Sequence, residues 1–149
     1  MTRGDEVWNS SQVWYMPFDD MNDPVTDEIS MWPWREAYYT INVCNFILSR
    51  TTGDDASLSE SMKRIKGQAL FLRGYSYYTL AGYYQNPALI TDYANYSSLD
   101  GLYGKNSTYD DVLDQVEKDF SEAMTLLPSR DEGGEWAKGR ATCGAAAGY

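Results

Sequence analysis

The stretch Gly67-Gln-Ala-Leu-Phe-Leu-Arg-Gly-Tyr-Ser-Tyr-Tyr-Thr-Leu80 decides the fold of this chain. It contains no proline, and its large apolar residues recur at the spacing of an α-helix. Two adjacent stripes run along it, one through Ile65, Ala69, Leu72 and Ser76 and the other through Phe71, Tyr75 and Tyr78. A helix with two such stripes is covered on more than one side, so the stretch is predicted to be the central helix.

Arg73 stands among the aromatic residues of this stretch. Its planar guanidinium is expected either to stack on a ring or to bind a carboxylate from another helix. Gly67, Gly74 and Gly82 lie in the same predicted helix, and each weakens a helix interior by about 1 kcal/mol relative to alanine. We therefore expect them to let another backbone approach closely.

Length and charge restrict the class of partner. A chain of 149 residues, 43% of them hydrophobic, suits one domain or a piece of a larger one. Acidic residues number 22 against 12 basic ones, which gives a net charge of −10. Such a surface repels nucleic-acid phosphates and anionic membranes, so a neutral ligand is expected. No stretch approaches the ~20 consecutive apolar residues of a membrane span.

The residue types present argue against catalysis. The chain has no histidine, which removes the commonest general base, the histidine-activated nucleophiles and most zinc sites. Cys44 and Cys143 are expected to be buried thiols rather than a disulfide. The remaining catalytic alternative is a glycosidase with two paired carboxylates. No acid lies in an apolar segment that would clearly raise its pKa, so we predict a non-catalytic protein without metal or cofactor.

Residues 1–33 are predicted to form an irregular region rich in turn-forming, acidic and aromatic residues. Its acidic run, from Asp19 to Glu28, lacks the glycine and glutamate spacing of a calcium-binding EF-hand loop. The run is therefore interpreted as a solvated loop. Trp8 and Trp14 of this region either contact a ligand or anchor the loop to the core.

Residues 34–149 are predicted to be helical, with long irregular loops at 86–107 and 129–138. A capping box is predicted at Ser57–Glu60, and Thr108 is predicted to cap the next helix with Asp111 three residues later. That helix carries an apolar stripe and an acidic opposite face made of Asp114, Glu117 and Asp119. The expected fold is all-α, with tetratricopeptide-like antiparallel pairs built from helices at 34–50, 57–85, 108–127 and 139–149.

Several helices also carry recognisable motifs. The central stretch is similar to Gly-Glu-Ala-x-Phe-Leu-Arg-Ala-x-x-Tyr-Phe-x-Leu, and residues 34–45 match Trp-x-x-x-Tyr-x-x-Ile-x-x-x-Asn. Residues 109–128 are similar to Tyr-x-x-Ile/Val-x-x-Asp-Leu-x-x-Ala-x-x-Leu-Leu-Pro, and Gly139-Arg-Ala-Thr-x-Gly-Ala-Ala looks like the segment that follows it. In this order and spacing the motifs resemble the SusD/RagB family, the surface glycan-binding lipoproteins of Bacteroidetes.

This resemblance implies a non-catalytic nutrient-uptake protein held at the cell outer membrane by a lipid anchor. It implies two partners, an oligosaccharide and a TonB-dependent SusC-like transporter that receives the oligosaccharide. The lipoprotein signal, its lipidated cysteine and the family's long C-terminal portion are not in this sequence, so we expect a fragment from the N-terminal part of the family fold.

The segment Thr2-Arg-Gly4 resembles a Thr-Arg-Gly loop that lies near the glycan site of the family. Tryptophan faces stack on sugar rings, while arginine, aspartate and asparagine bind hydroxyl groups. The ligand-binding residues are therefore predicted to be Arg3, Trp8, Trp14, Asp20 and Asn22. The alternative is a helical-repeat scaffold that binds a protein partner and has no sugar affinity of its own. The glycan and its linkage stay open.

Overall fold

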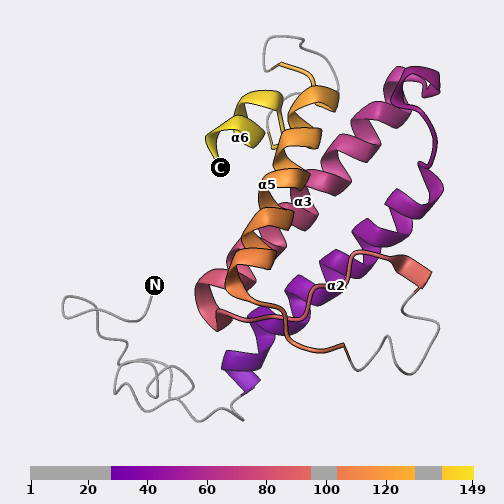
Figure 1. Cartoon of the computed structure of the whole chain (residues 1–149). Helices are drawn as coiled ribbons and strands as arrows, with labels where there is room; N and C mark the ends of the chain where they lie inside the picture. Colours follow the sequence, from indigo (N-terminus) through magenta and orange to yellow (C-terminus); the bar gives the residue numbers. More distant parts are fainter. Residues whose placement is uncertain (1–27, 95–103, 130–138) are drawn as a thin grey trace. The chain divides into compact units, whose positions relative to one another are not determined.

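The computed structural model describes residues 28–94, 104–129 and 139–149. Its helices, in chain order, are α2 (Glu28–Arg50), the short 3₁₀ helix η2 (Asp55–Ser57), α3 (Glu60–Tyr84), α5 (Tyr109–Leu126) and α6 (Cys143–Gly148) (Figure 1). The only β-type pairing within these ranges is an isolated antiparallel bridge between Ala88 and Asn106. The all-α fold with tetratricopeptide-like helix pairs is confirmed.

The start of α2 differs from the prediction. The helix expected from residue 34 begins at Glu28, so Pro33 lies inside it. The proline ring removes one backbone hydrogen bond, but the helix continues to Arg50, where it was predicted to end. Residues 37–149 form one compact unit, and the packing described below lies within that unit.

The capping box predicted at Ser57–Glu60 is wrong. Ser59 caps α3, and its hydroxyl accepts a hydrogen bond from the amide of Met62 at 3.3 Å. Ser57 is instead the last residue of η2, where its hydroxyl donates to the carbonyl of Asp54 at 2.6 Å. The preceding Asp54 closes a local turn of its own, and this turn takes Ser57 out of the cap position.

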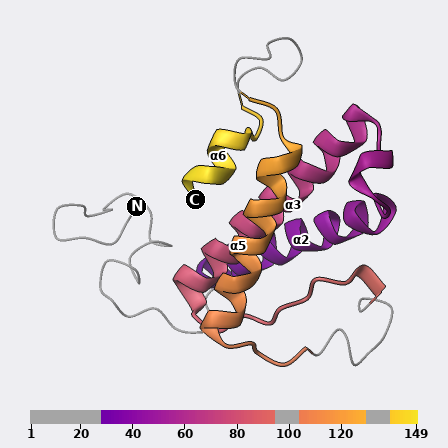
Figure 2. The ribbon, with the colours of Figure 1, turned by 45° about the horizontal axis from the view of Figure 1, so that its top comes forward.

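Helices α3 and α5 pack side by side, as both ribbon views show (Figures 1 and 2). Two of the three glycines of α3 make this possible. A Cβ atom at Gly67 would lie 3.0 Å from Leu127, and one at Gly74 would lie 3.2 Å from Asp119. A Cβ atom at Gly82 would meet nothing within 4 Å, so the predicted close approach is wrong for that position.

The face of α3 that is buried is narrower than the two predicted stripes. Ala69 and Ser76 are buried, but the other members of their stripe, Ile65 and Leu72, are each 45% exposed. The aromatic stripe is also largely outside the core, since Tyr75 is 43% and Tyr78 is 49% exposed. A central part of the core is a cluster made of Leu70, Ala123, Leu127 and Ala146.

Helix α5 begins as predicted. Thr108 and Asp111 form a reciprocal capping box, in which each side chain accepts the other's backbone N–H. Asp119, however, does not belong to an acidic outer face, because only 1% of its surface is exposed. Helix α6 begins at Cys143, capped by Thr142, rather than near Gly139.

Candidate functional site

The ligand-binding residues predicted from the sequence lie outside the described ranges. This holds for all of them: Arg3, Trp8, Trp14, Asp20 and Asn22. Their role stays a prediction. The described residues contain buried polar networks and two surface hollows, and the sequence alone predicts neither hollow.

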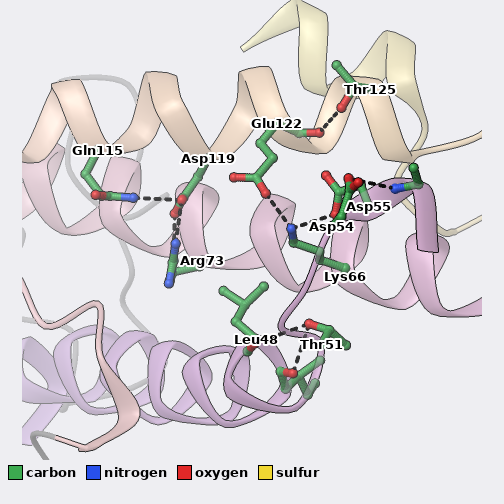
Figure 3. A network of polar contacts seen from close by, with 12 residues as sticks. Leu48, Thr51, Asp54, Asp55, Lys66, Arg73, Gln115, Asp119, Glu122 and Thr125 are labelled. Carbon is green, nitrogen blue, oxygen red and sulfur yellow. Dashed lines mark hydrogen bonds and ion pairs between the residues drawn. The ribbon is translucent and has the colours of Figure 1, made fainter. Parts of the chain in front are cut away.

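A buried polar network joins α2, α3, α5 and the segment that follows α3. Figure 3 shows its part between α3 and α5. The guanidinium of Arg73 on α3 donates to both carboxylate oxygens of Asp119 on α5, through Nε at 2.8 Å and Nη2 at 2.6 Å. Its Nη1 donates to the side-chain oxygen of Asn45 on α2 at 2.9 Å and to the carbonyl of Thr91 at 3.3 Å. Gln115 adds a further bond to Asp119 at 2.8 Å. Of the two roles predicted for Arg73, carboxylate binding is therefore the one observed.

The network keeps the guanidinium of Arg73 charged. Burial alone would lower the pKa of the Arg73 guanidinium, but the hydrogen bonds and negative charge of Asp119 outweigh burial and raise that pKa. Asp119 is a buried carboxylate, although the sequence pattern places it on an exposed acidic face. Arg73 and Gln115 occupy its oxygens, so this group is an ion-pair partner in the scaffold.

Motif residues of α2 and α3 hold the segment that follows α3. The amide group of Asn45 donates to the carbonyl of Ile90 at 2.7 Å, and the hydroxyl of Tyr38 donates to the carbonyl of Ala88 at 2.7 Å. The hydroxyl of Tyr77 both donates to the Ile90 carbonyl and accepts from the Ile90 amide, each at 2.8 Å. The segment thus gains side-chain partners for backbone groups that no sheet satisfies.

A second charged cluster ties η2 to the same helix pair (Figure 3). The ammonium group of Lys66 on α3 lies 2.9 Å from Asp55 and 2.7 Å from Glu122 on α5. Burial would lower the pKa of Lys66, but its hydrogen bonds to Glu122 and Asp55 raise it instead. The cluster fixes the turn between α2 and α3 against α5.

The first surface hollow is lined by tyrosines from α3, α5 and the C-terminal end of α6. We call it the tyrosine hollow; its volume is about 420 Å³, and its aromatic residues are Tyr75, Tyr78, Tyr83, Tyr109 and Tyr149. Two of these residues, Tyr75 and Tyr78, belong to the aromatic stripe that the helical spacing predicts to be covered, but they are 43% and 49% exposed. The only signal for the hollow in the sequence was the high tyrosine content, 13 residues in all.

The second hollow is an apolar groove between α2 and α3. Val43 and Ile47 line it from α2, and Ile65 and Leu72 line it from α3; its volume is about 290 Å³. Cys44 also borders the groove, and burial raises the pKa of its thiol from 9.0 to about 11. A thiol with such a pKa is a poor nucleophile at neutral pH.

Neither hollow is a metal site. Among the described residues, no group of three or more acidic, cysteine or histidine side chains is placed to hold a metal ion. Both cysteines are free; Cys44 is buried, as predicted, whereas Cys143 is only partly so. Within the same ranges, no helix combines the length and apolar character needed to cross a membrane.

The helical scaffold is similar to several solved structures. A SusD-like carbohydrate binding protein from Bacteroides fragilis NCTC 9343 is 25% identical, with a TM-score of 0.73, and the match covers 84% of this chain and 24% of that chain. A SusD homolog from Bacteroides thetaiotaomicron VPI-5482 is 22% identical, with a TM-score of 0.77 and coverage of 90% and 26%. A laminarin binding SusD-like protein is 23% identical, with a TM-score of 0.75 and coverage of 92% and 28%.

The chain thus spans about a quarter of the length of these solved relatives. No curated protein is similar enough to match it. A family match nevertheless extends over residues 2–149, to the family SusD-like_3, described as "Starch-binding associating with outer membrane". This match runs through all four α-helices described above, so the chain belongs to the SusD-like family.

Proposed function

We propose that the protein containing this chain binds a neutral glycan at the bacterial outer membrane and delivers it to a TonB-dependent SusC-like transporter. The observation that carries the proposal is the family match over residues 2–149, whose description joins starch binding to the outer membrane. The net charge of −10 supports a neutral ligand over an anionic one. In this role the protein binds and transfers its ligand without chemical change.

The glycan contacts are proposed in residues 1–33. Trp8 and Trp14 supply flat apolar faces for sugar rings, and Arg3, Asp20 and Asn22 supply hydrogen bonds to hydroxyl groups. What supports this proposal is the chemistry of these side chains and the resemblance of Thr2-Arg-Gly4 to the Thr-Arg-Gly loop of the family.

The glycan proposal is tested by calorimetric titration of the chain with two neutral glucans, maltoheptaose and laminarihexaose. At least one should bind, and Trp8→Ala and Trp14→Ala should each weaken binding about tenfold without lowering Tm. The matched control is Trp32→Ala, which removes an exposed tryptophan on α2 and should leave affinity unchanged. Unchanged affinity in both loop variants would refute the assignment of the loop.

Delivery to a transporter is tested separately, by co-purification from outer membranes of cells that express the intact protein. A barrel-type transporter should be recovered with wild-type protein and with the Trp8→Ala variant alike. If the transporter is recovered but no glycan binds, the protein is a helical-repeat interaction scaffold. If neither partner is recovered, the delivery role is wrong.

A further inference from the structure

The chain turns sharply at Gln85, where α3 ends. This residue has φ 61° and ψ −65°, and it is the only non-glycine residue with a positive φ in the described ranges. The amide of Asn86 donates to the carbonyl of Tyr84 at 2.7 Å, which closes a three-residue turn around Gln85. These angles are close to those of a γ-turn with positive φ, which is rare and strained. Gln85 therefore holds backbone strain.

The residues after Gln85 prevent the chain from relieving this strain by continuing the helix. Pro87 has no amide hydrogen, and its ring restricts Asn86 to extended conformations. The side chain of Pro87 is itself fully buried, so packing fixes its position. The reversal of the chain is thereby confined to Gln85.

Residues 86–91, which we call the strap, run back from this turn beside α2 and α3 (Figure 2). Side chains of these two helices bond to the strap's backbone at Ala88, Ile90 and Thr91; they are Tyr38, Asn45, Tyr77 and Arg73. Along the strap, the partner on α3 changes from Tyr77 to Arg73, so the strap runs antiparallel to α3. Strained conformations persist only where surrounding contacts determine them, and these bonds are such contacts.

The strap also bonds to the residue that precedes the cap of α5. The amide of Leu89 donates to the hydroxyl of Ser107 at 3.1 Å, and the amide of Ser107 donates to the carbonyl of Pro87 at 3.2 Å. Ser107 adjoins Thr108, which caps α5, so it stays with that helix. A strap that leaves the helices must therefore break both bonds to Ser107.

The strap can leave without separating the helices. The guanidinium of Arg73 would lose its longest bond, 3.3 Å to the carbonyl of Thr91, but would keep those to Asp119 and Asn45. Departure of the strap also relieves the strain at Gln85. Release of the strap therefore costs less free energy than separation of α2, α3 and α5.

We propose that Gln85 and the strap form a strained hinge with a latch. The strap moves as one unit about Gln85, between the latched position and a released one, while the helices stay packed. The side-chain bonds from α2 and α3 favour the latched position, and the strain at Gln85 favours release. A ligand or partner with different affinity for the two positions would shift their balance. The device is independent of the proposed glycan site, because its contacts lie among residues 38–91 and 107.

Hydrogen exchange of the intact protein, resolved at single amides by fragmentation mass spectrometry, tests movement as a unit. The amides of Leu89, Ile90 and Ser107 are the reporters, because the strap's departure breaks the bond of each. They should share one protection factor, at least tenfold below that of the amide of buried Leu80 within α3. Three different protection factors, or a factor equal to that of Leu80, would overturn the proposal.

The latch is tested with Tyr38→Phe, which keeps the ring and removes the hydroxyl that donates to Ala88. Exchange at the three reporters should become faster by one common factor of about ten, and exchange at Leu80 should not change. Tyr39→Phe is the matched control, because this neighbouring ring is 68% exposed, and it should change none of these rates. Faster exchange at one reporter alone would show that the strap does not move as a unit.

The hinge is tested with two substitutions of Gln85. Gln85→Gly removes the steric cost of the positive φ, so exchange at the reporters should become about tenfold slower. Gln85→Ala removes most of the side chain but keeps the Cβ atom and its strain, so these rates should stay close to those of the wild type. Equal rates in the two variants would show that Gln85 stores no strain, and the proposed hinge would be wrong.

Discussion

The guanidinium of Arg73 and the carboxylate of Asp119 face each other across the α3–α5 interface, joined by two hydrogen bonds of 2.8 and 2.6 Å. The residues are 46 positions apart in the sequence and almost fully buried in the fold. A buried ion pair of this geometry repays its desolvation only while both partners are present. It therefore fixes the register of the two helices, and its removal has a predictable cost.

Loss of one partner should destabilise the protein strongly. Asp119→Leu or Arg73→Met leaves an uncompensated buried charge, so each should lower the free energy of unfolding by about 3–5 kcal/mol. The double variant should cost clearly less than the sum of the two single variants, because it leaves no charge unpaired. Urea unfolding measures all three values.

The control for this cycle is the exposed pair of Lys63 and Glu60, 2.9 Å apart on the first turn of α3. Glu60→Gln should leave stability nearly unchanged, because water and salt screen an exposed pair. Strictly additive costs at Arg73 and Asp119 would contradict the assignment of these residues as a coupled pair.

Two glycines of α3 should respond in opposite directions to the same substitution. At Gly74 a new Cβ atom would lie 3.2 Å from the Cβ of Asp119, which its ion pair holds in place, so Gly74→Ala should cost about 1–3 kcal/mol. At Gly82 the space is open, so Gly82→Ala should stabilise the helix by about 0.5–1 kcal/mol.

Thermal unfolding of the two alanine variants decides this prediction, and each serves as the control for the other. A lower Tm for both would mean that Gly82 also lies against a neighbouring segment. A higher Tm for both would mean that α5 can move away from α3 at little cost.

Burial of the Cys44 thiol should make stability fall at alkaline pH. The unfolded chain loses this proton near pH 9.0, whereas the folded chain keeps it until about pH 11. The stabilising contribution is therefore complete below about pH 9 and is lost as the pH rises to about 11, by roughly 2–3 kcal/mol in total. Unfolding of wild-type protein and Cys44→Ala across this range isolates the effect, since other titrating groups are common to both.

Thiol labelling gives a second readout of the same burial. At neutral pH an aromatic disulfide reagent should modify Cys143 in the folded protein and leave Cys44 unmodified, because Cys44 is buried and Cys143 is only partly so. Both should react after denaturation. Rapid labelling of Cys44 in the native protein would show that the groove beside it opens readily.

The hydroxyl of Tyr77 should contribute to stability through the segment that it holds. Tyr77→Phe leaves the carbonyl and the amide of Ile90 each short of one partner, so it should cost about 1–3 kcal/mol. Hydrogen exchange of the Ile90 amide should become faster. Tyr78→Phe is the control, because the adjacent ring is 49% exposed and its hydroxyl makes no such contact. Equal effects of the two substitutions would contradict this role.

The sequence by itself determined the features that depend on near neighbours. The capping box of Thr108 and Asp111 and the end of α5 before Pro128 were predicted correctly, because their atoms are a few positions apart. The all-α class followed from apolar spacing in the same way. The family motifs pointed to the SusD-like fold, although the loop residues expected to bind ligand lie outside the described ranges.

Only the tertiary structure decided which faces those helices bury. Asp119 looked like part of an acidic outer face, and its burial depends on Arg73 from a distant helix. The aromatic stripe of α3 looked like core, but its Tyr75 and Tyr78 are nearly half exposed and border a hollow. Periodicity shows that a helix has an apolar face, but the angle at which the next helix packs determines which residues on that face are shielded from water.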